Sequence, residues 1–163
     1  MTDAMLGAII GKTGADFRLW SHHADLVELC LFDTSGETEL ARLSMTRGEG
    51  DVHHVFVEGL KEGARYGFRI HGPYDPAQGH WYDPSKLLVD PYATAIDRPY
   101  RHMPELAEPG FDTLALAGFT DAFTIASISS SLGHRSFSVT GWPLASWPST
   151  SFSMSKRMVP AMA

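Results

Sequence analysis

Six apolar segments of strand length, separated by short connections, constrain the fold of this chain more than any other feature of its sequence. Four of the connections carry glycines. Short strands at this spacing with glycine-bearing turns are typical of a β-sandwich. We therefore predict an all-β fold whose strands are Leu6–Ile10, Asp16–Trp20, Leu26–Phe32, Glu39–Met45, Val52–Val57 and Arg65–Ile70.

Alternation of apolar and polar residues assigns inward faces to these segments. Tyr66, Phe68 and Ile70 share one face, opposite two arginines, because successive side chains of a strand point to opposite sides. Leu26–Phe32 is apolar at nearly every position, which predicts a central strand covered on both faces. Cys30, inside that segment, is predicted to be a small buried hydrophobic residue.

The segment Asp16–Trp20 also alternates, with Phe17 and Leu19 on one face. Trp20 interrupts the polar set on the other face. Since its neighbours are apolar, we assign Trp20 to the core rather than to a ligand site.

Prolines recur from His71 to Gly110. Proline removes a backbone donor and restricts the residue before it, so this stretch is predicted to form ordered loops rather than regular sheet. Lys86–Asp90 is the exception and could form one short turn or strand.

Three short motifs lie in this proline-rich stretch. They are HGPYDP at residues 71–76, GH at residues 79–80 and DPSKLLVDPYA at residues 83–93. Together they resemble the junction segment of isoamylases and bacterial glycogen debranching enzymes of the α-amylase superfamily, where the motifs read HGPYDP, GHRFNP and KLLLDPYA. FRLWS at residues 17–21 and VELCLFD at residues 27–33 resemble the first strands of that family. The resemblance covers residues 5–113.

The resemblance implies an immunoglobulin-like β-sandwich at residues 1–75 and a proline-rich, loop-rich junction at residues 76–117, leading toward a catalytic barrel that the chain lacks. The family hydrolyses α-1,6 branch linkages in glycogen or limit dextrin. The chain is thus expected to be an N-terminal domain that binds or positions the glucan, with the barrel as its intramolecular partner. A stand-alone glycogen-binding or interaction module is the alternative, although such modules generally lack these motifs.

Residues 118–163 differ from the rest of the chain. Their only charged residues after Phe119 are Asp121, Arg135, Lys156 and Arg157, serines cluster, and neither a strand nor a helix period is sustained. The resemblance also ends before this point. We predict an irregular tail, produced by a frameshift near Gly118.

The family's catalytic motifs match no position of this chain, so no catalytic residue is assigned and the chain alone is predicted to be inactive. A retaining glycosidase needs two carboxyl groups about 5 Å apart on rigid elements. The carboxylates Asp33, Asp75, Asp83 and Asp90 instead lie in turns or Asp-Pro loops. We predict that they cap backbone amides or are solvated.

Four residues of the junction are candidates for carbohydrate binding: Tyr74, His80, Trp81 and Tyr82. Aromatic rings stack on the apolar face of a glucose ring, and their polar rims offer hydrogen bonds. Trp-Tyr-Asp replaces the family's Arg-Phe-Asn at residues 81–83, which leaves the sugar contacts open. The alternative, that these aromatics pack the sandwich against a barrel, is favoured by the position of the segment in the family.

Neither a metal site nor a cofactor is expected. His22 and His23, like His53 and His54, are adjacent, and neighbours on a strand point apart, whereas zinc needs three or four convergent ligands. The segment Gly11–Gly14 lacks the upstream glycine of a phosphate loop and is predicted to be a turn.

The net charge is −6, which argues against nucleic acid or an anionic membrane as a partner, since both select basic surfaces. A neutral α-glucan, bound weakly or not at all, is compatible with this charge. The single cysteine excludes an intrachain disulfide, and neither a signal peptide nor a membrane span is evident. A cytoplasmic location is therefore expected.

Overall fold

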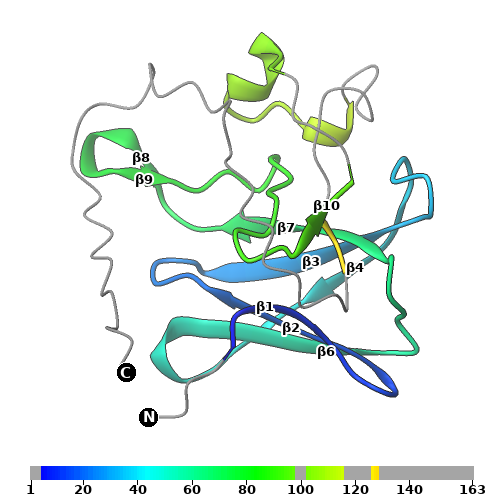
Figure 1. The fold of residues 1–163 in the computed structure, drawn as a ribbon. Helices are drawn as coiled ribbons and strands as arrows, with labels where there is room; N and C mark the ends of the chain where they lie inside the picture. The colour runs from blue at the N-terminus through cyan, green and yellow to red at the C-terminus, as the bar shows by residue number, and fades with distance from the viewer. Residues whose placement is uncertain (1–4, 98–101, 116–125, 129–163) are drawn as a thin grey trace, which may run out of the picture.

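The computed structural model describes residues 5–97, 102–115 and 126–128, and this part of the chain contains strands and short 3₁₀ turns but no α-helix (Figure 1). The predicted all-β fold is confirmed. The strands are β1 (Gly7–Ile10), β2 (Gly14–Trp20), β3 (Leu26–Phe32), β4 (Glu39–Ser44), β5 (Thr46–Arg47), β6 (Val52–Glu58), β7 (Arg65–His71), β8 (Tyr74–Asp75), β9 (His80–Trp81), β10 (Ala95–Ile96) and β11 (Ala126–Ser127). The 3₁₀ turns are η1 (Glu49–Asp51), η2 (Pro76–Gln78), η3 (Pro104–Ala107) and η4 (Thr113–Ala115).

Two antiparallel sheets pack face to face, as the predicted β-sandwich requires. The first sheet has the strand order β1-β2-β6-β5 and the second the order β10-β11-β7-β3-β4. In Figure 1 the first sheet lies below the second, and the junction segment lies above both. Phe17 of the first sheet meets Tyr66 of the second edge to face, with ring centroids 4.9 Å apart. The buried core between the sheets also includes Ala15, Leu19, Val27, Leu29, Leu31 and Phe68.

The predicted strand positions agree with the structure to within two residues at each end. Phe17 and Leu19 face the core, as their alternation predicted. β3 lies between β7 and β4 and is covered on both faces. Cys30, on its outward face, is fully buried, and this burial raises the pKa of its thiol to about 11. The turn at Gly11–Gly14 is closed by a 2.7 Å backbone hydrogen bond between its first and last residues.

The outward face of the second sheet is covered by two stretches of the junction segment, residues 83–88 and 102–115, which we together call the cap. A second apolar cluster joins the sheet to the cap through Cys30, Phe32 and Leu87. Met103, Leu106, Phe111 and Leu114 pack against this cluster. The cap is therefore part of the folded unit rather than a linker.

Leu88 extends the edge of β7 beyond the short strand β11. Phe68 and Leu88 exchange two backbone hydrogen bonds of 2.8 and 2.7 Å. This bridge is the short strand-like element that the sequence allowed at Lys86–Asp90. The cap passes so close to β7 that a Cβ at Gly67 would lie 2.9 Å from a methyl group of Leu87, so the position accommodates only glycine without displacement of the cap.

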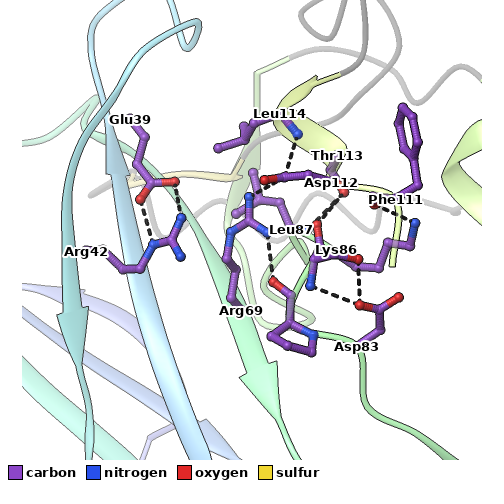
Figure 2. Close-up of polar contacts among 12 residues, drawn as sticks. Glu39, Arg42, Arg69, Asp83, Lys86, Leu87, Phe111, Asp112, Thr113 and Leu114 are labelled. Atoms are coloured by element: carbon purple, nitrogen blue, oxygen red, sulfur yellow. Dashed lines mark hydrogen bonds and ion pairs between the residues drawn. The ribbon is translucent and has the colours of Figure 1, made fainter. Parts of the chain in front are cut away.

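Arg69 anchors the cap from beneath. It is 1% exposed, and its guanidinium donates to the Pro84 carbonyl and to the Asp112 carboxylate, each at 2.7 Å (Figure 2). Burial opposes the ionisation of Asp112, but hydrogen bonds from Arg69 and from the Leu114 amide outweigh it and hold the pKa of this carboxyl below its ordinary value. A buried cation thus ties both ends of the cap to the sheet.

Asp83 and Lys86 join the two ends of the cap through hydrogen bonds. Asp83 accepts from the Ser85 hydroxyl at 2.5 Å and from the backbone amides of Ser85 and Gly110 at 2.9 and 2.8 Å. These bonds outweigh burial and lower the pKa of Asp83. The Lys86 ammonium donates to the carbonyls of Glu108 and Phe111 (Figure 2 draws the second bond). Residues 83–86 and 108–113 therefore hold each other in place.

The structure differs from the expected irregular tail at one place. Ala126 and Ser127 form β11, which pairs with β7 and β10 in the second sheet. Ala126 and Ile128 are buried in the main core. The alternation around β11 is confined to Ala126, Ser127, Ile128 and Ser129, which is too short to predict a strand among the surrounding serines. The rest of the predicted tail, and with it the frameshift, lies outside the described residues.

Candidate carbohydrate-binding site

A small hairpin projects from the end of β7 and carries the candidate site. β8 and β9 pair antiparallel, with Tyr74 opposite Trp81 and Asp75 opposite His80. The Asp-Pro sequence fixes the turn locally, since the Asp75 carboxylate accepts from the Ala77 amide at 3.1 Å. Gly79 ends the turn in the left-handed region, at φ 82°, which glycine adopts without steric cost.

Tyr74 and Trp81 form the exposed part of the predicted site. They are 48% and 46% exposed, and their rings meet edge to face with centroids 6.1 Å apart and planes at 86°. The side chains thus support each other and leave ring surface open to solvent. Such a pair offers an apolar face for a pyranose ring and a phenolic hydroxyl for hydrogen bonding.

Tyr82 has a different environment from its neighbour Trp81. It is half-buried and packs against the main core. Its ring lies on the backbone of Gly72, where an added Cβ would come within 2.7 Å of the Tyr82 Cγ. The structure therefore places Tyr82 under the hairpin as a support, apart from the exposed pair.

His80 is half-buried and belongs to a row of rings rather than to the Tyr74–Trp81 pair. Its ring centroid lies 4.8 Å from that of His23, which lies 4.4 Å from that of His22. Trp20 stands next in this row, 6.5 Å from His22. Four aromatic side chains from three parts of the chain thus form a continuous row along one end of the sandwich.

Trp20 is 51% exposed, so its assignment to the core is wrong. The alternation of β2 places it with Asp16 and Arg18 on the outward face, opposite Phe17 and Leu19. The period of the strand therefore carried the correct signal, which the apolar neighbours of Trp20 obscured.

Three further histidines, His53, His54 and His71, lie on strands of the sandwich. His53 is buried, donates from Nε2 to the Ser21 carbonyl at 3.3 Å, and has its pKa lowered by burial. His54 is exposed, so this pair points to opposite faces as predicted. His71 contacts Glu28 across the β3–β7 pair at 2.7 Å. The described residues contain no group of three or more metal-ligating side chains that could hold an ion.

The predicted turn-capping role of four carboxylates is confirmed. Asp33 accepts from the Glu37 amide at 3.0 Å, and Asp90 accepts from the Tyr92 amide at 2.8 Å. Asp75 and Asp83 cap their own turns in the same way. These carboxylates stabilise loops and are occupied by backbone donors.

Two packed antiparallel sheets with a projecting aromatic hairpin define the class of this protein as a β-sandwich module. The chain belongs to the family described as carbohydrate-binding module 48, the isoamylase N-terminal domain, whose pattern matches residues 5–93. That range contains both sheets except β10 and β11, the whole hairpin and the row from Trp20 to His80.

Glycogen debranching enzymes are among the similar proteins. The enzyme of Yersinia enterocolitica is 46% identical over 101 residues, which cover 62% of this chain and 15% of that protein. The enzyme of Serratia proteamaculans is 46% identical over 109 residues, or 67% of this chain and 16% of that protein. The chain thus spans about 15% of the length of these curated relatives.

A solved structure supports the fold. The product complex of the multi-modular glycogen-degrading pneumococcal virulence factor SpuA superimposes with a TM-score of 0.55 and 20% identity, over 78% of this chain and 12% of that chain. At this identity the likeness shows the fold alone. In the part of the chain that the structure describes, no helix has the length and apolar character to cross a membrane.

Proposed function

We propose that this chain is the glucan-binding or glucan-positioning N-terminal module of a glycogen debranching enzyme, and that Tyr74 and Trp81 contact the sugar. Membership of the carbohydrate-binding module family and 46% identity to glycogen debranching enzymes support the proposal. The observation that carries it is the exposed, mutually supported Tyr74–Trp81 pair on a hairpin inside the family-matched residues. The parent enzyme's hydrolysis of α-1,6 branch linkages belongs to the same proposal.

The contribution of the remaining predicted residues follows from their positions. In this proposal Tyr82, which is half-buried against Gly72, supports the hairpin, and the exposed pair makes the stacking contacts with the glucan. His80, half-buried beside His23, lies at the side of the exposed pair. A cytoplasmic location is also part of the proposal, since the lone cysteine forms none of the intrachain disulfides that oxidising compartments favour.

A shallow aromatic site on a sandwich is expected to bind with a dissociation constant in the high-micromolar to millimolar range, on the order of −4 to −6 kcal/mol. Affinity electrophoresis in glycogen-containing gels tests this. The chain is expected to be retarded, and Trp81→Ala is expected to remove most of the retardation. Phe56→Ala is the matched control, because Phe56 is 54% exposed on the first sheet and makes no ring contact in the hairpin.

The same experiment separates sugar binding from packing against a barrel. If Tyr74 and Trp81 serve only to pack against another domain, the chain shows no retardation, or Trp81→Ala leaves it unchanged. Either result would exclude the hairpin as the glucan site.

A further inference from the structure

Trp20 is a large apolar side chain exposed where the sandwich does not need it. It ends β2 and pairs in register with Val52 of β6 on the outward face of the first sheet. The core beneath is complete without it, through Phe17 and Leu19. Single exposed apolar residues are common in folded proteins, so it is the neighbours of Trp20 that decide whether this position is a binding surface.

His22 widens the apolar surface that Trp20 presents. The two rings are nearly parallel, with planes at 9° and centroids 6.5 Å apart. At this separation an aromatic pair is offset rather than face to face, so each ring keeps part of its face uncovered. The His22 side chain is 57% exposed, which confirms that the pair is open to solvent. Two parallel ring surfaces side by side suit the flat apolar face of a sugar.

The His22 ring is held in place by a charged network. Its Nδ1–H donates to the Asp51 carboxylate, which is also bound by the Arg47 guanidinium. Arg47 donates as well to the His22 carbonyl at 2.8 Å. These hydrogen bonds, first from His22 and then from Arg47, lower the pKa of Asp51. A fixed ring loses little conformational entropy when a ligand binds.

The backbone around Asp51 is specialised for this arrangement. Asp51 has φ 63° and is the one residue other than glycine with positive φ among the described parts of the chain. Such conformations persist where surrounding contacts determine them, and they cluster at functional sites. Here the left-handed turn brings the carboxylate under His22. Arg47 and Asp51 both bond to His22, so their polar atoms lie beside the ring surface.

The Trp20–His22 surface is continuous with the hairpin. His23 links it to His80 through the two edge contacts described above. His80 precedes Trp81 on β9. Figure 1 shows the β2–β3 connection and the β8–β9 hairpin at the same end of the molecule. Since His80 and Trp81 are successive residues of a strand, they point to opposite sides of the hairpin, and a polymeric ligand on the Tyr74–Trp81 pair would pass around the edge of the hairpin to reach Trp20 and His22.

We propose that Trp20 and His22 form a second stacking subsite for an α-glucan chain, with Arg47 and Asp51 binding hydroxyl groups at its rim. The proposal rests on the proposed function for the identity of the ligand, and it adds a site that is separate from the Tyr74–Trp81 pair. Two linked subsites favour long chains over short ones, because the second contact is intramolecular once the first has formed.

The test compares maltotriose, maltoheptaose and glycogen as probes of the full chain, its Trp20→Ala and Trp81→Ala variants and the double variant. Trp20→Ala is expected to weaken binding of glycogen and maltoheptaose about three- to tenfold. Maltotriose, which can occupy one subsite at a time, is expected to lose less than about twofold. The double variant should bind more weakly than either single variant. Phe56→Ala serves as the exposed aromatic control and should bind like the parent chain.

Trp20→Phe is the conservative control, because it keeps an aromatic ring on β2. It should retain most of the affinity that Trp20→Ala loses. The outcomes separate the two proposals. Glucan binding that depends on Trp81 but is identical in Trp20→Ala overturns the second subsite and leaves the proposed function intact. Binding lost in Trp20→Ala and unaffected by Trp81→Ala supports this subsite and overturns the hairpin site. If the parent chain binds none of the three probes, both proposals fail.

Discussion

Arg69 and Asp112 lie 43 residues apart in the chain and meet at 2.7 Å, where the arginine Nη2 donates to the carboxylate. The arginine is at the centre of the five-stranded sheet and almost fully buried, whereas the aspartate side chain is 49% exposed. The second guanidinium nitrogen holds the Pro84 carbonyl. One side chain therefore fastens both ends of the cap, and the hairpin lies between β7 and that cap.

We predict that Arg69→Ala lowers the free energy of unfolding by about 2–4 kcal/mol, because it removes a buried cation whose hydrogen bonds hold the Pro84 carbonyl and the Asp112 carboxylate to the sheet. Urea denaturation measures the change. Arg18→Ala is the control, since Arg18 forms a 2.7 Å ion pair with Asp16 near the surface and its loss should change stability by less than about 1 kcal/mol. Similar effects of the two substitutions would show that the cap does not depend on Arg69.

The cap is expected to loosen in acid. Asp83 and Asp112 have pKa values below the ordinary 3.8 in the folded chain, so the stability that they contribute is present above that value and is lost as the pH falls through the lowered pKa. Asp112→Asn should therefore lose less stability than the parent chain between about pH 5 and pH 2.5. Urea midpoints at each pH measure this. Equal losses in the two proteins would contradict the role of Asp112.

The pKa of Asp90 is shifted upward, so its effect on stability changes with pH in the opposite direction to that of Asp83 and Asp112. Burial, which outweighs hydrogen bonds from Tyr66 and the Tyr92 amide, raises the pKa of Asp90. The stability that Asp90 contributes is therefore present below pH 3.8 and declines as the pH rises through the pKa of the folded state.

Tyr66 donates to this carboxylate at 2.7 Å in a buried site. Tyr66→Phe should cost about 1–3 kcal/mol, since it leaves a buried acceptor unsatisfied. Thermal unfolding tests this, with Tyr92→Phe, at a 48% exposed position, as the neutral control. A neutral Tyr66→Phe would mean that Asp90 is satisfied by other donors.

We predict that the chain alone releases no reducing ends from glycogen or phosphorylase-limit dextrin. The reason is that no pair of carboxylates could be assigned as nucleophile and acid, and Asp33, Asp75, Asp83 and Asp90 are engaged by turns. A reducing-sugar assay on protein freed of contaminating amylases measures this. Activity that disappears when one of its own carboxylates is substituted would contradict the prediction.

The strands of the sandwich were predictable because several carry a period-two pattern, Leu26–Phe32 is a continuous apolar run, and four of the connections carry glycine. The cap was not predictable, since its polar contacts join residues that lie between 15 and 43 positions apart and share no local pattern. Arg69 shows the reason clearly: alternation predicted its face correctly but could not reveal that Pro84 and Asp112 would cover that face. β11 escaped prediction because it is two residues long and is held only by its partners.

The candidate site was predictable in part. Its residue types could be inferred from HGPYDP and GHWYDP, and Tyr74 and Trp81 are exposed together. The pairing of β8 with β9 was not predicted, because the prolines of this stretch indicated loops rather than sheet. The separation of Tyr82 from the Tyr74–Trp81 pair could not be predicted from the sequence, because it depends on the close approach of the Tyr82 ring to Gly72. The role of Trp20 depends on which of the two faces of the first sheet remains open, and only the packed structure shows this.

The central claim, that the aromatic hairpin binds α-glucan, is tested most directly by a nuclear magnetic resonance titration of the labelled chain with maltoheptaose. We predict chemical-shift changes of the Trp81 indole N–H and of the Tyr74 and His80 backbone amides. These changes should saturate with a dissociation constant in the high-micromolar to millimolar range. Cellohexaose, a β-linked glucan, should produce smaller shifts. The absence of shifts at the hairpin up to about 10 mM maltoheptaose, in a chain whose spectrum shows it folded, would contradict the account.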